Sequence, residues 1–135
     1  MEKIKVYIAS PYSNDWMPNA VRRQLRAFKL LSRAGFTPFA PLISHFLEIY
    51  QEAQFEREWL DWDIEWLKTC HVLVRIKAYD SDYNEIKSPG SDEEEAMARK
   101  SGIPVFVFES MESLEAWANT INKESILEMF YNDMK

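Results

Sequence analysis

The sequence predicts a doubly wound α/β fold, in which helices cover both faces of a parallel sheet. Four short segments, 3–9, 36–40, 72–76 and 103–108, are nearly continuous in apolar and β-branched residues. Helical patterns separate these segments, and this alternation is typical of parallel strands joined by crossover helices. In such sheets a ligand binds beyond the carboxyl ends of the strands, near the switch in strand order.

The first half of the chain supplies two of these strands and one clear helix. The strand 3–9 ends at the turn-rich residues 10–14, where Pro11 prevents its continuation. Apolar residues then recur at helical spacing from 18 to 34, with arginines and lysines on the opposite side, and Gly35 ends this helix. The second strand, 36–40, contains Pro38 and is followed by Pro41, so we expect it to open onto a loop.

An aromatic, mostly helical region follows at 46–70. Phe55, Trp59, Trp62 and Trp66 recur there every three or four residues, which indicates a stripe that faces apolar surface. We interpret this stripe as core or subunit interface, and favour an interface, rather than a platform for stacking a base.

The last third of the chain begins with the strand 72–76. Residues 77–89 are polar, as expected of an exposed loop, and a helix is predicted at 91–100. Gly102 ends this helix before the strand 103–108, and two short helices follow at 111–120 and 124–134.

Size and composition predict a single globular domain that spans 1–135. Apolar residues make up 47% and charged residues 28%, and no apolar run is long enough to cross a bilayer, so we expect no membrane association. Cys70 is the sole cysteine, which excludes an intrachain disulfide. Because the first residues also do not resemble a leader peptide, we expect a cytoplasmic protein.

The charge balance argues against a polymeric nucleic acid as partner. Sixteen lysines and arginines stand against twenty-two aspartates and glutamates, for a net charge of −6. A small anion remains possible, because loop amides and helix N-termini hold phosphate locally. Arg22 has two interpretations, as a phosphate contact at the first loop or, more commonly for such residues, as part of a solvated basic face.

The segment 88–96 joins a loop at a strand end to the start of a helix. Gly90 lets the backbone approach a ligand, and Ser88 and Ser91 add hydroxyl donors at a helix N-terminus, which together suit a phosphate. The spacing Ser91-x-x-Glu94 also fits a capping box, in which Glu94 bonds back to the Ser91 amide. Spacing alone favours this structural role for Glu94.

Four segments at the strand ends occur in a fixed order along the chain. They are Tyr7-Ile8-Ala9-Ser10-Pro11-Tyr12-Ser13, Pro41-Leu42-Ile43-Ser44-His45, Asp63-Ile64-Glu65-Trp66-Leu67 and Ser88-x-Gly90-x-x-x-Glu94-x-x-x-Ala98. Over roughly residues 3–108, this series resembles the nucleoside 2-deoxyribosyltransferase superfamily, and within it small bacterial and phage members with an Ala-Ser-Pro-Tyr-Ser first loop.

The resemblance implies a flavodoxin-like or Rossmann-like three-layer sandwich with a central parallel sheet. It also implies a homodimer or larger homo-oligomer, no cofactor and no metal, with a nucleotide or nucleoside as the small-molecule partner. In relatives, a glutamate at the position of Glu94 attacks the anomeric carbon. An aspartate at Asp63 handles the proton of the base or of a sugar hydroxyl, and a tyrosine at Tyr7 orients the glutamate.

The spacing of Ser88 and Gly90 is similar to that of the branch that hydrolyses nucleoside 5′-monophosphates. The resemblance therefore implies an N-glycosidase that cleaves the base–sugar bond of a (deoxy)nucleoside 5′-monophosphate through a glutamate nucleophile. A nucleoside 2-deoxyribosyltransferase, or a non-catalytic nucleotide-binding module on the same fold, remains the alternative. The candidate substrate- and phosphate-binding residues are Ser10, Pro11, Tyr12, Ser13, His45, Ser88, Gly90 and Ser91.

Two further expectations concern the chemistry of the site. We expect the helix N-terminus to lower the pKa of Glu94, and a drier setting beside two tryptophans to raise that of Asp63, so that one attacks and the other donates a proton. Two positions depart from the family pattern. His71 replaces the usual aspartate and is too isolated to suggest a metal, and the first loop lacks the arginine and glycines of the phosphate-binding branch.

Overall fold

A computed structural model describes residues 2–12, 14–43 and 56–133. The elements are, in chain order, β1 (Lys5–Ala9), α1 (Met17–Arg33), β2 (Thr37–Phe39), α2 (Glu56–Leu67), β3 (Val72–Ile76), α3 (Pro89–Lys100), β4 (Val105–Phe108), α4 (Met111–Thr120) and α5 (Lys123–Asp133). All four predicted strands are present. Within these described ranges, no helix is long and apolar enough to cross a membrane.

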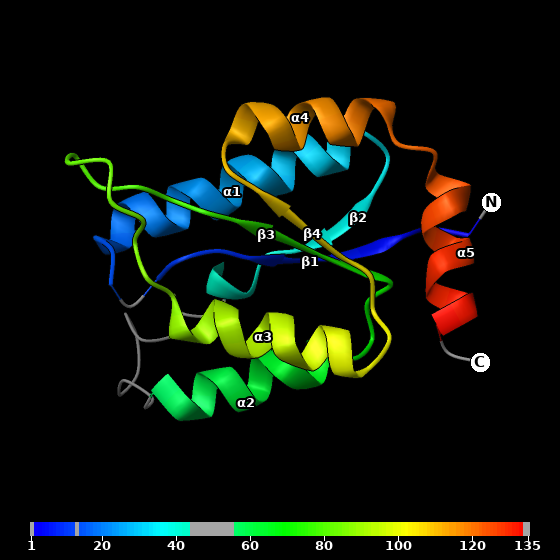
Figure 1. The fold of residues 1–135 in the computed structure, drawn as a ribbon, viewed down its shortest axis with the longest axis horizontal. Coiled ribbons are helices and arrows are strands. Elements are labelled where there is room, and N and C mark those ends of the chain that lie inside the picture. The colour runs from blue at the N-terminus through cyan, green and yellow to red at the C-terminus, as the bar shows by residue number, and fades with distance from the viewer. Residues whose placement is uncertain (1, 13, 44–55, 134–135) are drawn as a thin grey trace.

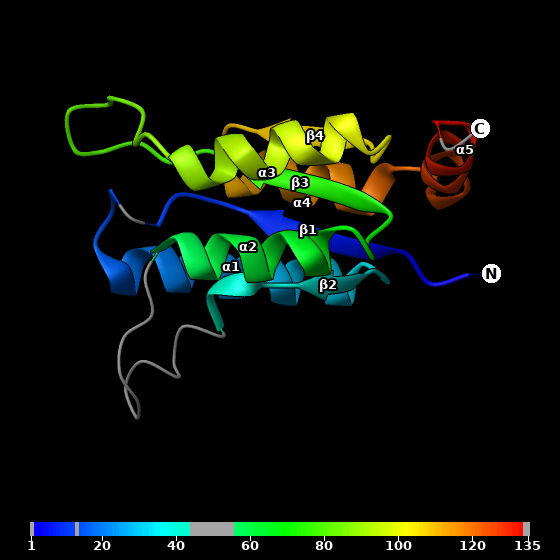
Figure 2. The same ribbon diagram turned by 90° about the horizontal axis from the view of Figure 1, so that it is seen from below.

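The sheet is parallel throughout and has the strand order β2-β1-β3-β4. Helices α1 and α4 cover one face, α2 and α3 cover the other, and α5 lies at the end of the sheet near the N-terminus (Figures 1 and 2). This three-layer arrangement confirms the predicted fold class. The chain leaves β1 toward β2 on one side and returns to β3 on the other, so the switch in strand order lies at β1.

The alternation of side chains along β1 decides which residues reach the two helical layers. Val6 and Ile8 pack with α1 and α4 in one apolar cluster, whereas Tyr7 and Ala9 pack with α2 and α3 in the other. Tyr7 is therefore fully buried on the α3 side of the sheet, close to its carboxyl edge.

The start of α3 differs from the prediction in a way that matters for the site. The helix begins at Pro89, and Ser88 is its cap, because the Ser88 Oγ accepts the amide of Ser91 at 3.3 Å. Proline suits a first helical turn, where its missing N–H has no partner to lose. The capping box proposed for Ser91 and Glu94 is therefore wrong, and Glu94 lies one turn further inside the helix.

The tryptophan stripe of α2 does not share one environment. Trp59 is buried, whereas Trp62 and Trp66 are about half exposed, at 54% and 48%. Trp66 stacks on Phe39 of β2 with ring centroids 5.8 Å apart. Phe55 and the predicted helical residues before it lie outside the described ranges.

Candidate active site

Side chains from three different elements lie together at a cavity that two of them line. Tyr7 comes from β1, Asp63 from α2 and Glu94 from α3, and Asp63 and Glu94 both line the cavity. The phenol of Tyr7 donates a hydrogen bond to Oε2 of Glu94, although 87 residues separate them along the chain. The fold thus assembles the three residues that the resemblance assigned to catalysis.

Burial sets the protonation of Glu94. Its side chain is 7% exposed, and desolvation raises the pKa to about 8. The Tyr7 hydrogen bond lowers this pKa, the nearby Asp63 raises it again, and Arg75 lowers it. The expected lowering by the helix N-terminus is wrong, because Glu94 lies past the first turn, where the helix dipole fades and burial dominates.

Asp63 is also buried, and its Oδ1 has no hydrogen-bond partner within the part of the chain that the structure describes. Desolvation raises its pKa to about 7, in the expected direction. A buried oxygen without a partner carries a desolvation cost of about 1–3 kcal/mol, which a bound donor or proton can offset. Asp63 is therefore suited to hold a proton near neutral pH and to release it to a ligand.

Ser88 and Gly90 line the same cavity, whereas Ser91 lies behind them. Ser91 is buried, and the Ser88 hydroxyl donates to its Oγ at 2.8 Å. A methyl group at Gly90 would meet no other atom within 4 Å, so its backbone faces open space. The start of α3 therefore has open space beside Gly90, in the cavity that Glu94 also lines.

The first loop contributes only part of the predicted set. Tyr12 lines the cavity, but Ser10 and Pro11 are buried and do not. The Ser10 Oγ has no hydrogen-bond partner among the described residues, and the Pro11 carbonyl accepts from Arg23 at 3.5 Å. Two other predicted residues, Ser13 and His45, lie outside the described ranges.

Sequence reasoning missed Gln24, which is 2% exposed and lines the cavity from α1. Its Nε2 donates to the Ile8 carbonyl at 3.2 Å, and its Oε1 accepts from the Leu42 amide at 3.2 Å. It thus ties the loop after β2 to the end of β1. The available signal was a glutamine in the buried stripe of α1, which otherwise reads Ala20, Ala27 and Leu31.

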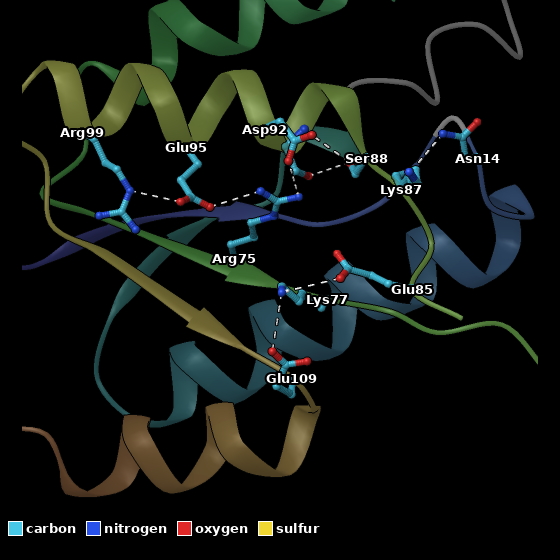
Figure 3. A network of polar contacts seen from close by, with 11 residues as sticks. Asn14, Arg75, Lys77, Glu85, Lys87, Ser88, Asp92, Glu95, Arg99 and Glu109 are labelled. Atoms are coloured by element: carbon cyan, nitrogen blue, oxygen red, sulfur yellow. Dashed lines mark hydrogen bonds and ion pairs between the residues drawn. The ribbon is translucent and has the colours of Figure 1, made fainter. Parts of the chain in front are cut away.

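Sequence reasoning also missed Arg75, at the carboxyl end of β3. Its guanidinium pairs with Asp92 at 2.7 Å and with Glu95 at 3.1 Å, and Glu95 in turn pairs with Arg99 at 3.0 Å (Figure 3). Glu95 is therefore held by two arginines. The signal was a single arginine in the apolar strand Val-Leu-Val-Arg-Ile. These pairs fasten α3 to β3 and hold Glu94 over the sheet.

Two further residues lie away from this cavity. Arg22 is exposed and lines a different cavity, on the α1–α4 side of the sheet. His71 is at the amino end of β3, where it pairs with Glu2 at 2.8 Å and its Nδ1 accepts the Lys5 amide at 3.0 Å. No cluster of three His, Cys, Asp or Glu side chains suited to a metal occurs among the described residues.

Comparison with known proteins bears on the fold of the chain. No protein-family model matches the chain, and no curated protein matches it. Among solved structures, a 2-deoxyribosyltransferase from the psychrotolerant bacterium Bacillus psychrosaccharolyticus superposes with a TM-score of 0.62 at 20% sequence identity. The match covers 90% of this chain and 95% of that chain. The chain therefore has a nucleoside 2-deoxyribosyltransferase-like fold.

Proposed function

We propose that the chain cleaves the N-glycosidic bond of a (deoxy)nucleoside 5′-monophosphate, with Glu94 as the nucleophile. The observation that carries this proposal is the buried hydrogen bond from Tyr7 to Glu94, with Asp63 in the same cavity. Support also comes from the fold, which is similar to that of an enzyme described as a 2-deoxyribosyltransferase.

The proposed reaction has two steps. Oε1 of Glu94, the oxygen that Tyr7 does not contact, attacks the anomeric carbon while the bond to the base breaks, and Asp63 transfers its proton to the departing base. Water, deprotonated by the Asp63 carboxylate, then attacks the same carbon and releases the sugar phosphate, which restores both carboxyl groups. Tyr7 donates to Oε2 throughout and so keeps Oε1 directed at the sugar.

The protonation of the two carboxyls constrains this reaction. The attack requires ionised Glu94 and protonated Asp63, but their pKa values are about 8 and about 7, in the opposite order. Only a minority of the free protein therefore carries the productive pair at neutral pH. Positive charge that develops on the sugar favours the carboxylate of Glu94 and draws the complex toward that state.

The start of α3 supplies the basis for a 5′-phosphate. The open backbone at Gly90 and the hydroxyl of Ser88 line the cavity beside Glu94, at a helix N-terminus that favours an anion. The cavity holds about 60 Å³, well below the ~300 Å³ of small ligand sites, so substrate entry requires its walls to separate.

A 2-deoxyribosyltransferase is the second candidate, and the similarity to the Bacillus psychrosaccharolyticus enzyme favours it. The first step is the same in both reactions. In the transferase a second base takes the place of water and receives the sugar from Glu94.

Chromatographic detection of free base tests the proposal. The wild-type protein is incubated with ribo- and deoxyribonucleosides and their 5′-monophosphates, with and without a second base, and compared with Glu94→Gln. The control is Glu93→Gln, which removes the same charge from the exposed neighbouring residue. We expect base release from monophosphates by wild type and the control only. Release that requires a second base identifies a transferase, and tight binding without release by any variant leaves a non-catalytic binding module.

A further inference from the structure

A second cavity lies at the carboxyl edge of the sheet, on the face opposite to Glu94. It encloses about 270 Å³ between α1, α4 and the end of β3, and its polar lining consists of Asn19, Arg22, Arg23, Arg26 and Lys77. Ile76 also lines it and belongs to the apolar cluster of the α1–α4 side, whereas Tyr7 belongs to the cluster of the other side. The two cavities share no lining residue, although α1 contributes to both, through Gln24 at the proposed active site and through three arginines here.

Two of the four cations at this cavity already have counterions. Arg23 pairs with Asp15 at 2.8 Å, and Lys77 lies 3.6 Å from both Glu85 and Glu109 (Figure 3). Arg22 and Arg26, in contrast, make no ion pair or hydrogen bond with any residue in the described ranges. Two exposed guanidinium groups without a paired carboxylate among the described residues thus lie at one cavity of a protein whose net charge is −6.

The spacing of these arginines indicates which kind of anion would fit the cavity. Arg22 and Arg26 are one turn apart on the same face of α1, where like charges repel each other, and Asn19 adds an amide donor one turn earlier. Two planar guanidinium groups on one side of a cavity match the oxygens of a phosphate, which each can bind through paired hydrogen bonds. The volume approaches the ~300 Å³ at which small-ligand sites begin.

We propose that this cavity is a second binding site, independent of Glu94, for a small phosphate-bearing molecule held by Arg22 and Arg26. Three carboxylates pair with the other two cations, Asp15 with Arg23 and both Glu85 and Glu109 with Lys77. Four cations thus stand against three carboxylates, so a net charge of +1 remains and favours a compact anion. The site adds a ligand to the protein beyond the substrate of the proposed reaction.

Inorganic pyrophosphate is the probe for this site, followed by ¹H–¹⁵N NMR of the whole chain at constant ionic strength. The amide signals identify which site binds, because the start of α3 also suits a phosphate. Binding at the second cavity shifts the amides of Asn19, Ile76 and Lys77, whereas binding at the proposed active site shifts those of Gly90 and Ser91. We expect saturable shifts of the first group, which Glu94→Gln leaves unchanged.

The double variant Arg22→Gln/Arg26→Gln tests the two arginines directly. Each charge-assisted contact to phosphate contributes roughly a factor of ten or more to affinity, so the first group of shifts should no longer saturate. The matched control is Lys3→Gln/Lys100→Gln, which removes the same net charge at exposed positions outside both cavities and should bind as wild type does. Thermal denaturation confirms that both double variants fold, as expected for substitutions of exposed side chains.

Three results overturn the proposal. They are shifts confined to Gly90 and Ser91, equal weakening by both double variants, and saturable binding of polyglutamate at this cavity without binding of pyrophosphate. The last result assigns the cavity to an acidic polypeptide.

Discussion

Replacing Tyr7 with phenylalanine removes the hydroxyl that holds Glu94 without altering the ring packed in the core. The hydroxyl lowers the pKa of Glu94, which burial raises to about 8. A hydrogen bond to a charged group contributes about 1.5–3 kcal/mol, and about 1.4 kcal/mol corresponds to one pKa unit. We therefore expect Tyr7→Phe to raise the pKa of Glu94 by a further 1–2 units, approximately.

This shift changes the pH profile of kcat/KM in a defined way. The productive form has ionised Glu94 and protonated Asp63, so pKa values of about 8 and about 7 give a maximum near pH 7.5, where about 6% of the protein is productive. Raising the pKa of Glu94 by one more unit moves the maximum of the profile to about pH 8 and lowers the productive fraction of the protein to about 1%. The inflection on the alkaline side moves up by about one pH unit, the inflection near pH 7 that belongs to Asp63 stays in place, and the maximal rate falls by roughly sevenfold or more.

The assay measures kcat/KM for base release from about pH 5 to about pH 10 in wild type, Tyr7→Phe and Tyr131→Phe. Tyr131 is a matched control, because its hydroxyl also donates to a carboxylate, that of Glu2, at an exposed site near the chain termini. We expect the control to follow the wild-type profile. A Tyr7→Phe profile that is lower by the same factor at every pH, with an unshifted alkaline inflection, would refute the claim that Tyr7 sets the protonation of Glu94.

Four further predictions concern neighbouring residues. The folded state raises the pKa of Glu94 from 4.5 to about 8, so the buried carboxyl lowers the free energy of unfolding progressively as pH rises through this interval. In urea titrations, Glu94→Gln should therefore match the stability of wild type near pH 5 but exceed it by up to ~4 kcal/mol near pH 9. Gly90→Ala meets no atom within 4 Å, so it should keep the melting temperature while lowering kcat/KM for monophosphates more than for nucleosides; equal losses on both substrates count against a phosphate at this amide. Gln24→Leu leaves the Ile8 carbonyl and the Leu42 amide without partners and should lower the free energy of unfolding by ~2–4 kcal/mol, whereas an unchanged urea midpoint contradicts its bridging role. If the half-exposed face of Trp62 and Trp66 joins two copies of the chain, Trp62→Glu/Trp66→Glu should reduce the sedimentation mass to that of a monomer, and an unchanged mass places any interface elsewhere.

The sequence predicts the sheet well because its strands are short apolar runs that tolerate few alternatives. The strand 72–76 has the predicted bounds, and the other strands differ at their ends. The start of α3 was missed because two local signals compete there. Ser91-x-x-Glu94 fits a cap as well as Ser88-Pro89 does, and only the distant partner Tyr7 shows that Glu94 points into the core.

The pKa values of the candidate site residues were harder to predict from the sequence than which residues are candidates. Resemblance to a family pointed to Glu94 and Asp63 as candidates, but their pKa values depend on how completely the sheet and two helices exclude water. No local pattern contains that information. Gln24 and Arg75 were missed for a related reason, since a polar residue within an apolar stripe signals a buried partner without identifying it.

The separation of Tyr7 and Glu94 by 87 residues bears on when the proposed active site forms during folding. Their contact requires β1 to be paired with β3 and α3 to be docked on both strands, and parallel pairing closes long loops before it gains contacts. During refolding, a species with native helices and an incomplete sheet would hold both carboxyls in water, at their ordinary acidity. Recovery of base release in a refolding experiment would therefore report completion of the whole sheet, later than the recovery of helical signal by circular dichroism.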